Sequence, residues 1–155
     1  MQLVLLRHGT AVPHGLAGLD DAERPLVADG EREARAAGRA LRALKVRPDR
    51  VVTSPLVRAR QTAQLAAAEL GVPSFEDGAL APGFDHTALD GLFARHDGDC
   101  IVLVGHDPDL SRLVHDLTGA QVSMAKGGVA RIDYPRGELR WMLRPHALRL
   151  IAKAA

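Results

Sequence analysis

The sequence has a single cysteine, few aromatic residues and almost no net charge. Cys100 has no second cysteine to pair with, which excludes an internal disulfide and suits a reducing compartment. Aromatic residues make up 3% of the 155 residues, so the core must be built from closely packed alanine, leucine and valine. A formal net charge of +1 gives no overall basic field and therefore argues against nucleic-acid binding.

Long hydrophobic runs are also missing. The apolar run at residues 3–6 ends at Arg7, which is too short for a signal peptide or a membrane span. We therefore expect a soluble, cytoplasmic protein with no membrane partner. A chain of 155 residues can bury one proper core, and we expect one domain over residues 1–155.

Strand-like and helix-like segments alternate along the chain. Short apolar runs predict strands over residues 2–6, 50–53, 101–104, 129–134 and 139–143. Helices are predicted over residues 29–45, 55–70, 87–95 and 108–118 and from residue 146 onward. Residues 72–86 are expected to form a loop with a possible edge strand. The alternation predicts a three-layer α/β fold, with a mostly parallel central sheet and helices on both faces.

The expected helix ends carry residues typical of caps. Asp29, Ser54 and Asp107 are expected to cap the first, second and fourth helices, and the latter two are each followed by a proline. Gly71 and Gly119 are expected to end the second and fourth helices.

Three strand-to-helix junctions contain unusual residues. They read RHG at residues 7–9, SPLVRARQTA at residues 54–63 and GHDP at residues 105–108. Because the carboxyl ends of parallel strands gather at one edge of a sheet, we expect His8, Arg58 and His106 to meet there. Arg58 lies in the first turn of its helix, so its side chain should lean back over that edge.

These side chains suit a phosphoryl group. Arg7 and Arg58 present planar forks of donors that match phosphoryl oxygens. A neutral His8 imidazole can attack phosphorus as a covalent nucleophile, and the neighbouring Arg7 should disfavour its charged form. His106, once protonated, would donate a further hydrogen bond to the oxygens.

Together, the three motifs resemble the signatures of the histidine phosphatase superfamily, and the short chain is similar to its phosphohistidine phosphatase SixA type. The resemblance extends from residue 2 to about residue 117. It implies a phosphoglycerate mutase-like fold and a metal-independent phosphatase in which His8 becomes phosphorylated. It also implies that Arg7, Arg58 and His106 bind the phosphoryl oxygens, and that no metal or organic cofactor is needed.

One feature departs from the pattern of the superfamily. Its members usually carry a carboxylate that acts as general acid after the third β element, whereas residues 78–83 contain none. Asp85 and, after it, Asp77 are the nearest substitutes. An alkyl phosphate ester needs a proton for its leaving alkoxide, whereas the imidazole of phosphohistidine leaves more readily. The missing acid, together with little spare length for a lid, favours phosphohistidine presented on another protein.

Two alternatives remain open at this point. The first is a small-molecule phosphomonoesterase of the same superfamily, acting on a phosphorylated metabolite. The second is a phosphate-binding module without turnover, which the presence of both arginines and both histidines disfavours. The other five histidines show no metal-ligand spacing, so we expect no metal site. The oligomeric state is left open.

Overall fold

A six-stranded sheet forms the centre of the protein, which a computed structural model describes over residues 1–155, the side chain of residue 17 excepted. The strands are β1 (Gln2–Arg7), β2 (Arg50–Thr53), β3 (Ser74–Glu76), β4 (Cys100–Gly105), β5 (Val129–Asp133) and β6 (Glu138–Leu143). Their order across the sheet is β3-β2-β4-β1-β5-β6. Strands β1 to β4 run parallel to one another, β5 runs antiparallel to β1, and β6 runs antiparallel to β5. The predicted mostly parallel sheet and its edge strand β3 are confirmed.

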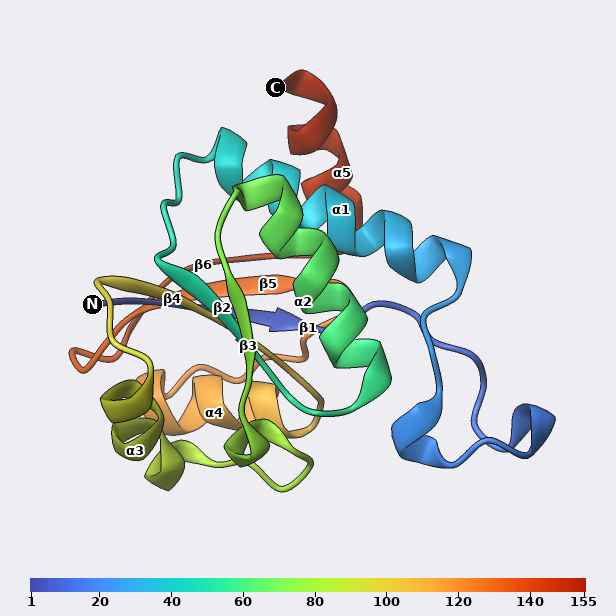
Figure 1. Ribbon diagram of the computed structural model, residues 1–155. Helices are drawn as coiled ribbons and strands as arrows, with labels where there is room; N and C mark the ends of the chain where they lie inside the picture. The colour runs from blue at the N-terminus through green and yellow to red at the C-terminus, as the bar shows by residue number, and fades with distance from the viewer.

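Helices cover both faces of this sheet (Figure 1). One face carries α1 (Ala28–Ala43), α2 (Val57–Leu70) and α5 (Pro145–Ala154), and the other carries α3 (Leu89–Arg95) and α4 (Asp109–Thr118). Successive side chains of a strand point to opposite faces. In β1, Val4 and Leu6 therefore enter the core under α1 and α2, whereas Leu3 and Leu5 enter the core under α3 and α4. The predicted three-layer α/β fold is confirmed.

Small side chains dominate the first of these cores, as the shortage of aromatics predicted. Alanines of α1 and α2 face each other there, and the two helices approach closely at Gly38. A Cβ atom at Gly38 would lie 2.8 Å from the carbonyl oxygen of Ala66 in α2. Cys100 is buried in the same core, and burial raises its thiol pKa to about 11, so it packs as a small apolar residue.

Two of the three predicted helix caps are wrong. The residue before α1 is Val27, and Asp29 lies inside the first turn, where it pairs with Arg32 on the surface. The residue before α2 is Leu56 rather than Ser54. In both cases the residue type suited a cap, but the chain enters the helix at a different position.

The third cap and both helix ends follow the predicted chemistry more closely. Asp107 accepts a hydrogen bond from the Ser111 amide at 3.0 Å, which satisfies a free N–H of the first turn although α4 itself begins at residue 109. Gly71 and Gly119 follow α2 and α4 in the left-handed conformation, with φ angles of 70° and 78°.

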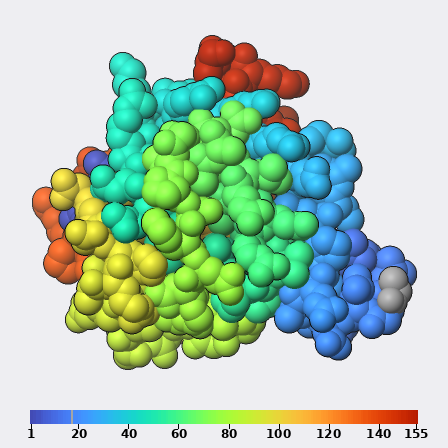
Figure 2. All heavy atoms as spheres, viewed as in Figure 1, coloured from blue at the N-terminus to red at the C-terminus, as the bar shows by residue number. Residues whose placement is uncertain are grey.

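The connection between β1 and α1 projects from one side of the molecule (Figures 1 and 2). It contains two short 3-10 turns, Leu16–Gly18 and Asp21–Glu23, and it is tied at its base by a bridge between Ala11 and Leu26. At the other end of the chain, α5 packs against α1. Among the described residues, no helix has both the length and the apolar character needed to cross a membrane.

Candidate active site

The three junctions meet at the carboxyl edge of β2, β4 and β1, which are neighbours in the sheet. The His8 amide donates to the Gly105 carbonyl oxygen at 3.1 Å, and the Ser54 amide donates to the Val104 carbonyl oxygen at 3.0 Å. The rings of His8 and His106 lie 5.2 Å apart between centroids. Arg58 Nε lies 3.4 Å from His8 Nε2. The predicted meeting of His8, Arg58 and His106 is confirmed.

His8 is held in the form that a nucleophile needs. Its ring is 6% exposed, and Nδ1 lies 2.7 Å from the Gly9 carbonyl oxygen. Because a carbonyl oxygen only accepts, Nδ1 carries the proton and Nε2 carries a lone pair, which accepts a hydrogen bond from Arg58 Nε at 3.4 Å. Burial lowers the pKa of His8 to about 3, against the opposing effect of the Gly9 hydrogen bond. The charges of His106, Arg58 and Arg7 add smaller effects, so burial outweighs the Arg7 repulsion expected from the sequence.

Arg58 is fixed by a residue that the sequence did not reveal. Arg58 Nη1 donates to the Asp21 carbonyl oxygen at 2.7 Å, and Nη2 donates to Asp21 Oδ2 at 3.2 Å. Arg24 binds the other carboxylate oxygen, and hydrogen bonds from Arg24 and Arg58 hold the pKa of Asp21 at about 2. Asp21 lies in a loop with neither periodicity nor a motif, so no sequence signal distinguished it from its acidic neighbours.

Arg7 precedes His8 at the end of β1. Its Nη1 donates to the Met124 carbonyl oxygen at 2.7 Å and lies 4.0 Å from Asp107 Oδ2. Its Nε is buried and has no partner among the described residues. Since buried donors are nearly always satisfied, this N–H is suited to bind an anion such as a phosphoryl group.

His106 differs from the expectation in its charge. Burial is the largest cause that lowers its pKa to about 4, followed by the charge of Arg58, while Asp109 acts in the opposite direction. At neutral pH the ring is therefore uncharged, and the expected protonated donor is not found. His106 Nε2 lies 2.7 Å from Ser54 Oγ, whereas Nδ1 is buried and has no partner among the described residues.

Further residues of the second motif support the nucleophile. Thr62 Oγ1 accepts a hydrogen bond from the Gly9 amide at 3.1 Å, and Gln61 Oε1 accepts one from the Leu26 amide at 2.8 Å. Gly9 also lies against Gly30 of α1, where a Cβ atom on Gly9 would be 2.6 Å from the Gly30 carbonyl oxygen. These supporting roles were missed, because each depends on a contact between segments far apart in the sequence.

The two carboxylates considered as general acids are both engaged elsewhere. Asp77 accepts from Arg95 Nε at 2.9 Å and lies 2.8 Å from His96 Nε2, and its pKa falls to about 2, mainly through the Arg95 hydrogen bond. Asp85 caps a short turn by binding Thr87, which lowers its pKa as well. Both are ionised at neutral pH, so neither carries the proton that a general acid donates.

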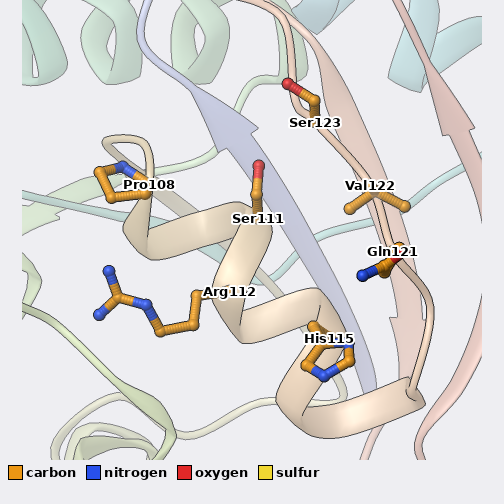
Figure 3. A pocket seen from close by; sticks show the side chains of 7 residues that line it. All are labelled: Pro108, Ser111, Arg112, His115, Gln121, Val122 and Ser123. Atoms are coloured by element: carbon orange, nitrogen blue, oxygen red, sulfur yellow. The ribbon is translucent and has the colours of Figure 1, made fainter.

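A groove runs along α4 beside the site (Figure 3). It has a volume of about 560 Å³ and is lined by Pro108, Ser111, Arg112, His115, Gln121, Val122 and Ser123. Ser111 Oγ donates to Asp107 Oδ2 at 2.6 Å and accepts from the Met124 amide at 3.0 Å. Because Asp107 and Met124 both contact Arg7, this groove wall is joined to the site. Among the described residues, no group of three or more His, Cys, Asp or Glu side chains is placed to hold a metal ion.

Comparison with known proteins identifies the family of the chain. The family model described as histidine phosphatase superfamily (branch 1) matches residues 3–81, which contain the first two motifs. The chain belongs to this superfamily. The third motif, with His106, lies beyond the matched residues, and its place in the site comes from the structure.

Among individual members of the histidine phosphatase superfamily, the chain is SixA-like. It is 30% identical over 166 residues to phosphohistidine phosphatase SixA of Escherichia coli, covering 99% of each chain. It is 36% identical over 138 residues to an uncharacterized protein of Picosynechococcus, covering 83% of this chain and 82% of the other. A structure of SixA complexed with tungstate superposes with a TM-score of 0.83 at 26% identity, covering 96% of this chain and 99% of that one.

Proposed function

We propose that the protein is a phosphatase that transfers a phosphoryl group to His8 and then to water, and that its substrate is phosphohistidine on another protein. The observation that carries this proposal is the state of His8. Its ring is neutral, and Nε2 carries the lone pair, which accepts a hydrogen bond from Arg58 Nε at 3.4 Å. A neutral nitrogen beside cationic donors is the arrangement that attack on phosphorus requires.

In the first step, His8 Nε2 attacks the phosphorus of the substrate. A nitrogen–phosphorus bond forms to His8 as the bond to the substrate imidazole breaks, and the departing nitrogen keeps the electron pair and takes a proton from water. Arg58 and Arg7 donate to the phosphoryl oxygens, on which the negative charge is concentrated. The Nδ1–H bond to the Gly9 carbonyl oxygen stabilises the positive charge that develops on His8.

In the second step, water attacks the phosphorus of phosphorylated His8. The bond between phosphorus and His8 Nε2 breaks, its electron pair returns to the ring, and the water proton leaves to solvent with the release of inorganic phosphate. The same donors hold the oxygens during this step. His8 is then neutral again, since burial keeps its pKa near 3.

Several features support a phosphohistidine substrate. Asp77 and Asp85 are ionised, so neither supplies a proton to a departing alkoxide, whereas an imidazole leaves with less help. The open groove along α4 offers room for the surface of a partner protein beside the site. The Escherichia coli relative, which the chain matches over 99% of its length, is described as a phosphohistidine phosphatase.

A comparison of substrates tests this proposal. The purified protein is assayed in excess EDTA on a phosphohistidine-bearing carrier protein and on a panel of phosphate monoesters. We expect kcat/KM to be at least tenfold higher for the carrier protein. A preference for one of the monoesters would replace the proposed substrate with a metabolite. Loss of activity in EDTA, restored by zinc or magnesium, would overturn the mechanism.

A second measurement identifies the nucleophile. Wild-type protein quenched in alkali during turnover should carry an acid-labile phosphoryl group on His8, detectable by mass spectrometry. His8→Ala should lose turnover by roughly a factor of a thousand or more, because the covalent path is gone. His146→Ala, which removes an exposed imidazole, is the matched control and should keep wild-type activity. A label on His106 instead of His8 would show that the nucleophile is misassigned.

A further inference from the structure

Ser54 occupies an unexpected place in the second motif. Its residue type and position predicted a helix cap, but α2 begins three residues later, after Leu56. The side chain is instead fully buried between the ends of β2 and β4. Its hydroxyl oxygen accepts a hydrogen bond from the Leu56 amide at 3.3 Å and lies 2.7 Å from His106 Nε2.

The single proton of this hydroxyl decides how the contact is made. A serine hydroxyl has one hydrogen to donate and two lone pairs to accept with. The Leu56 amide uses one lone pair, and His106 Nε2 is the acceptor that the described residues offer to the hydrogen. If Nε2 carried a proton and donated instead, the Ser54 hydrogen would be buried without an acceptor, which is energetically unfavourable. The hydroxyl therefore donates and Nε2 accepts.

This assignment fixes the other nitrogen of the ring. A neutral imidazole carries one proton, so an accepting Nε2 places the proton on Nδ1. His106 is neutral because burial and the charge of Arg58 lower its pKa to about 4. Nδ1 is buried and has no partner among the described residues. The ring lies 5.2 Å from that of His8 between centroids, so an unpartnered Nδ1–H belongs to a ring that lies close to a phosphoryl group bound to His8.

We propose that Ser54 is a positioning residue that holds His106 in the Nδ1–H tautomer, so that an uncharged imidazole donates a hydrogen bond to the phosphoryl oxygens. The assignment of His106 as an oxygen-binding residue rests on the proposed function. In the opposite tautomer, a bare Nδ1 lone pair would face the negatively charged oxygens, and the site would lose a donor and gain a repulsive contact. Ser54 thus allows the site to keep a buried histidine without a buried third positive charge.

Nitrogen NMR of the protein tests this proposal directly. In ¹⁵N-histidine-labelled wild type at neutral pH, Nδ1 of His106 should show the shift of a protonated ring nitrogen and Nε2 that of an unprotonated one. In Ser54→Ala the two shifts should move towards each other or exchange, and kcat should fall by roughly ten- to a hundredfold. Ser54→Thr keeps the hydroxyl and should restore the wild-type tautomer and most of kcat.

Thr118→Val is the matched control, because it removes a hydroxyl that binds the Val114 carbonyl oxygen at the far end of α4. It should leave both the His106 shifts and kcat unchanged. A protonated Nε2 in wild type, or a Ser54→Ala protein with unchanged shifts and kcat, would overturn the role of Ser54. The wild-type spectrum decides the tautomer even where a variant fails to fold. Failure of the proposed function has a different signature, since wild type would then prefer a phosphate monoester or turn over no phosphorylated substrate, whatever its tautomer.

Discussion

His8 and His106 lie side by side at the carboxyl edge of the sheet, and in each ring one nitrogen makes the hydrogen bond that sets the tautomer. His8 Nδ1 donates to the Gly9 carbonyl oxygen, and His106 Nε2 faces the Ser54 hydroxyl. The other nitrogen of each ring therefore has a different hydrogen-bonding role. Nε2 of His8 carries a lone pair, whereas Nδ1 of His106 is a proposed donor. Two residues of the same type can thus take the roles of nucleophile and oxygen binder because their backbone and hydroxyl partners differ.

The lowered pKa values of these two rings make a prediction about stability. In the unfolded chain both imidazoles take up a proton near pH 6.5, whereas in the folded protein they do so only near pH 3 and pH 4. Between about pH 6.5 and pH 4 the unfolded state binds more protons, so the free energy of unfolding falls as the pH falls. The expected slope is about 1 kcal/mol per pH unit for each imidazole. Urea unfolding at pH 7.5, 6.5, 5.5 and 4.5 measures it.

A double variant isolates the contribution of the two histidines. His8→Gln combined with His106→Gln should flatten the slope in this range, while His146→Gln should keep it. Asp21 and Asp77, whose pKa values are both about 2, lose their contribution only below about pH 4 and so act outside the range. Equal slopes in wild type and the double variant would show that the buried imidazoles do not carry the effect.

At the residue scale, the sequence predicts the side chains that meet at the candidate site better than the residues that hold them there. The predicted side chains lie at strand ends or in a first helical turn, where topology alone brings them together. They are Arg7, His8, Arg58 and His106. Asp21 and the role of Ser54 could not be found in this way. Asp21 binds Arg58, which lies 37 positions along the chain, and Ser54 binds His106, which lies 52 positions along it. Their roles also depend on which atom of that partner they contact.

At the scale of single elements, α1 positions the segment around His8 as much as the strand β1 that precedes it. Gly30, in the first turn of α1, lies in close contact with Gly9 and Thr10. One turn later, Glu33 accepts hydrogen bonds from the Thr10 amide and hydroxyl. The periodicity of residues 29–45 predicted the helix. It gave no sign of this contact, because a glycine in the first turn of a helix carries no periodic signal.

Gly30→Ala tests this contact between α1 and the loop after β1. The new Cβ would overlap the Thr10 carbonyl oxygen, and backbone on both sides leaves it little room to move. We expect a loss of about 1–3 kcal/mol in the free energy of unfolding, with a lower kcat, because Gly9 carries the oxygen that fixes His8. Urea unfolding and aryl phosphate turnover measure the two effects.

Gly91→Ala in α3 is the matched control for a helical glycine. There the Cβ would meet only the end of the Arg95 side chain, at 3.4 Å. The exchange should leave kcat unchanged and raise the free energy of unfolding by up to about 1 kcal/mol, since alanine favours the helix. A Gly30→Ala protein that behaves in the same way as Gly91→Ala would contradict the role given to the close approach.

At the scale of the whole molecule, the alternation of strands and helices predicted the layers but not the strand order. β4 lies between β1 and β2, and this insertion places His106 beside both His8 and Ser54. Nothing in the pattern of apolar residues distinguishes this order from one in which β1 and β2 are neighbours. The antiparallel pair β5 and β6 could be predicted, because the short turn at residues 135–137 leaves no length for a crossover helix.

Binding of an oxyanion at this junction should stabilise the whole fold, since the site exists only when β1, β2 and β4 are assembled. Inorganic phosphate at a hundred times its Kd should add about 2.7 kcal/mol to the free energy of unfolding. For a chain of this length, that corresponds to a rise of roughly 5–10 °C in Tm. Thermal unfolding in phosphate, against chloride at equal ionic strength, measures the specific part.

Arg58→Gln should lose most of the rise, because a buried donor to the oxygens is gone. Arg60→Gln removes an exposed arginine that pairs with Glu76 and should keep it. Equal shifts in the two variants would mean that phosphate binds outside the proposed site.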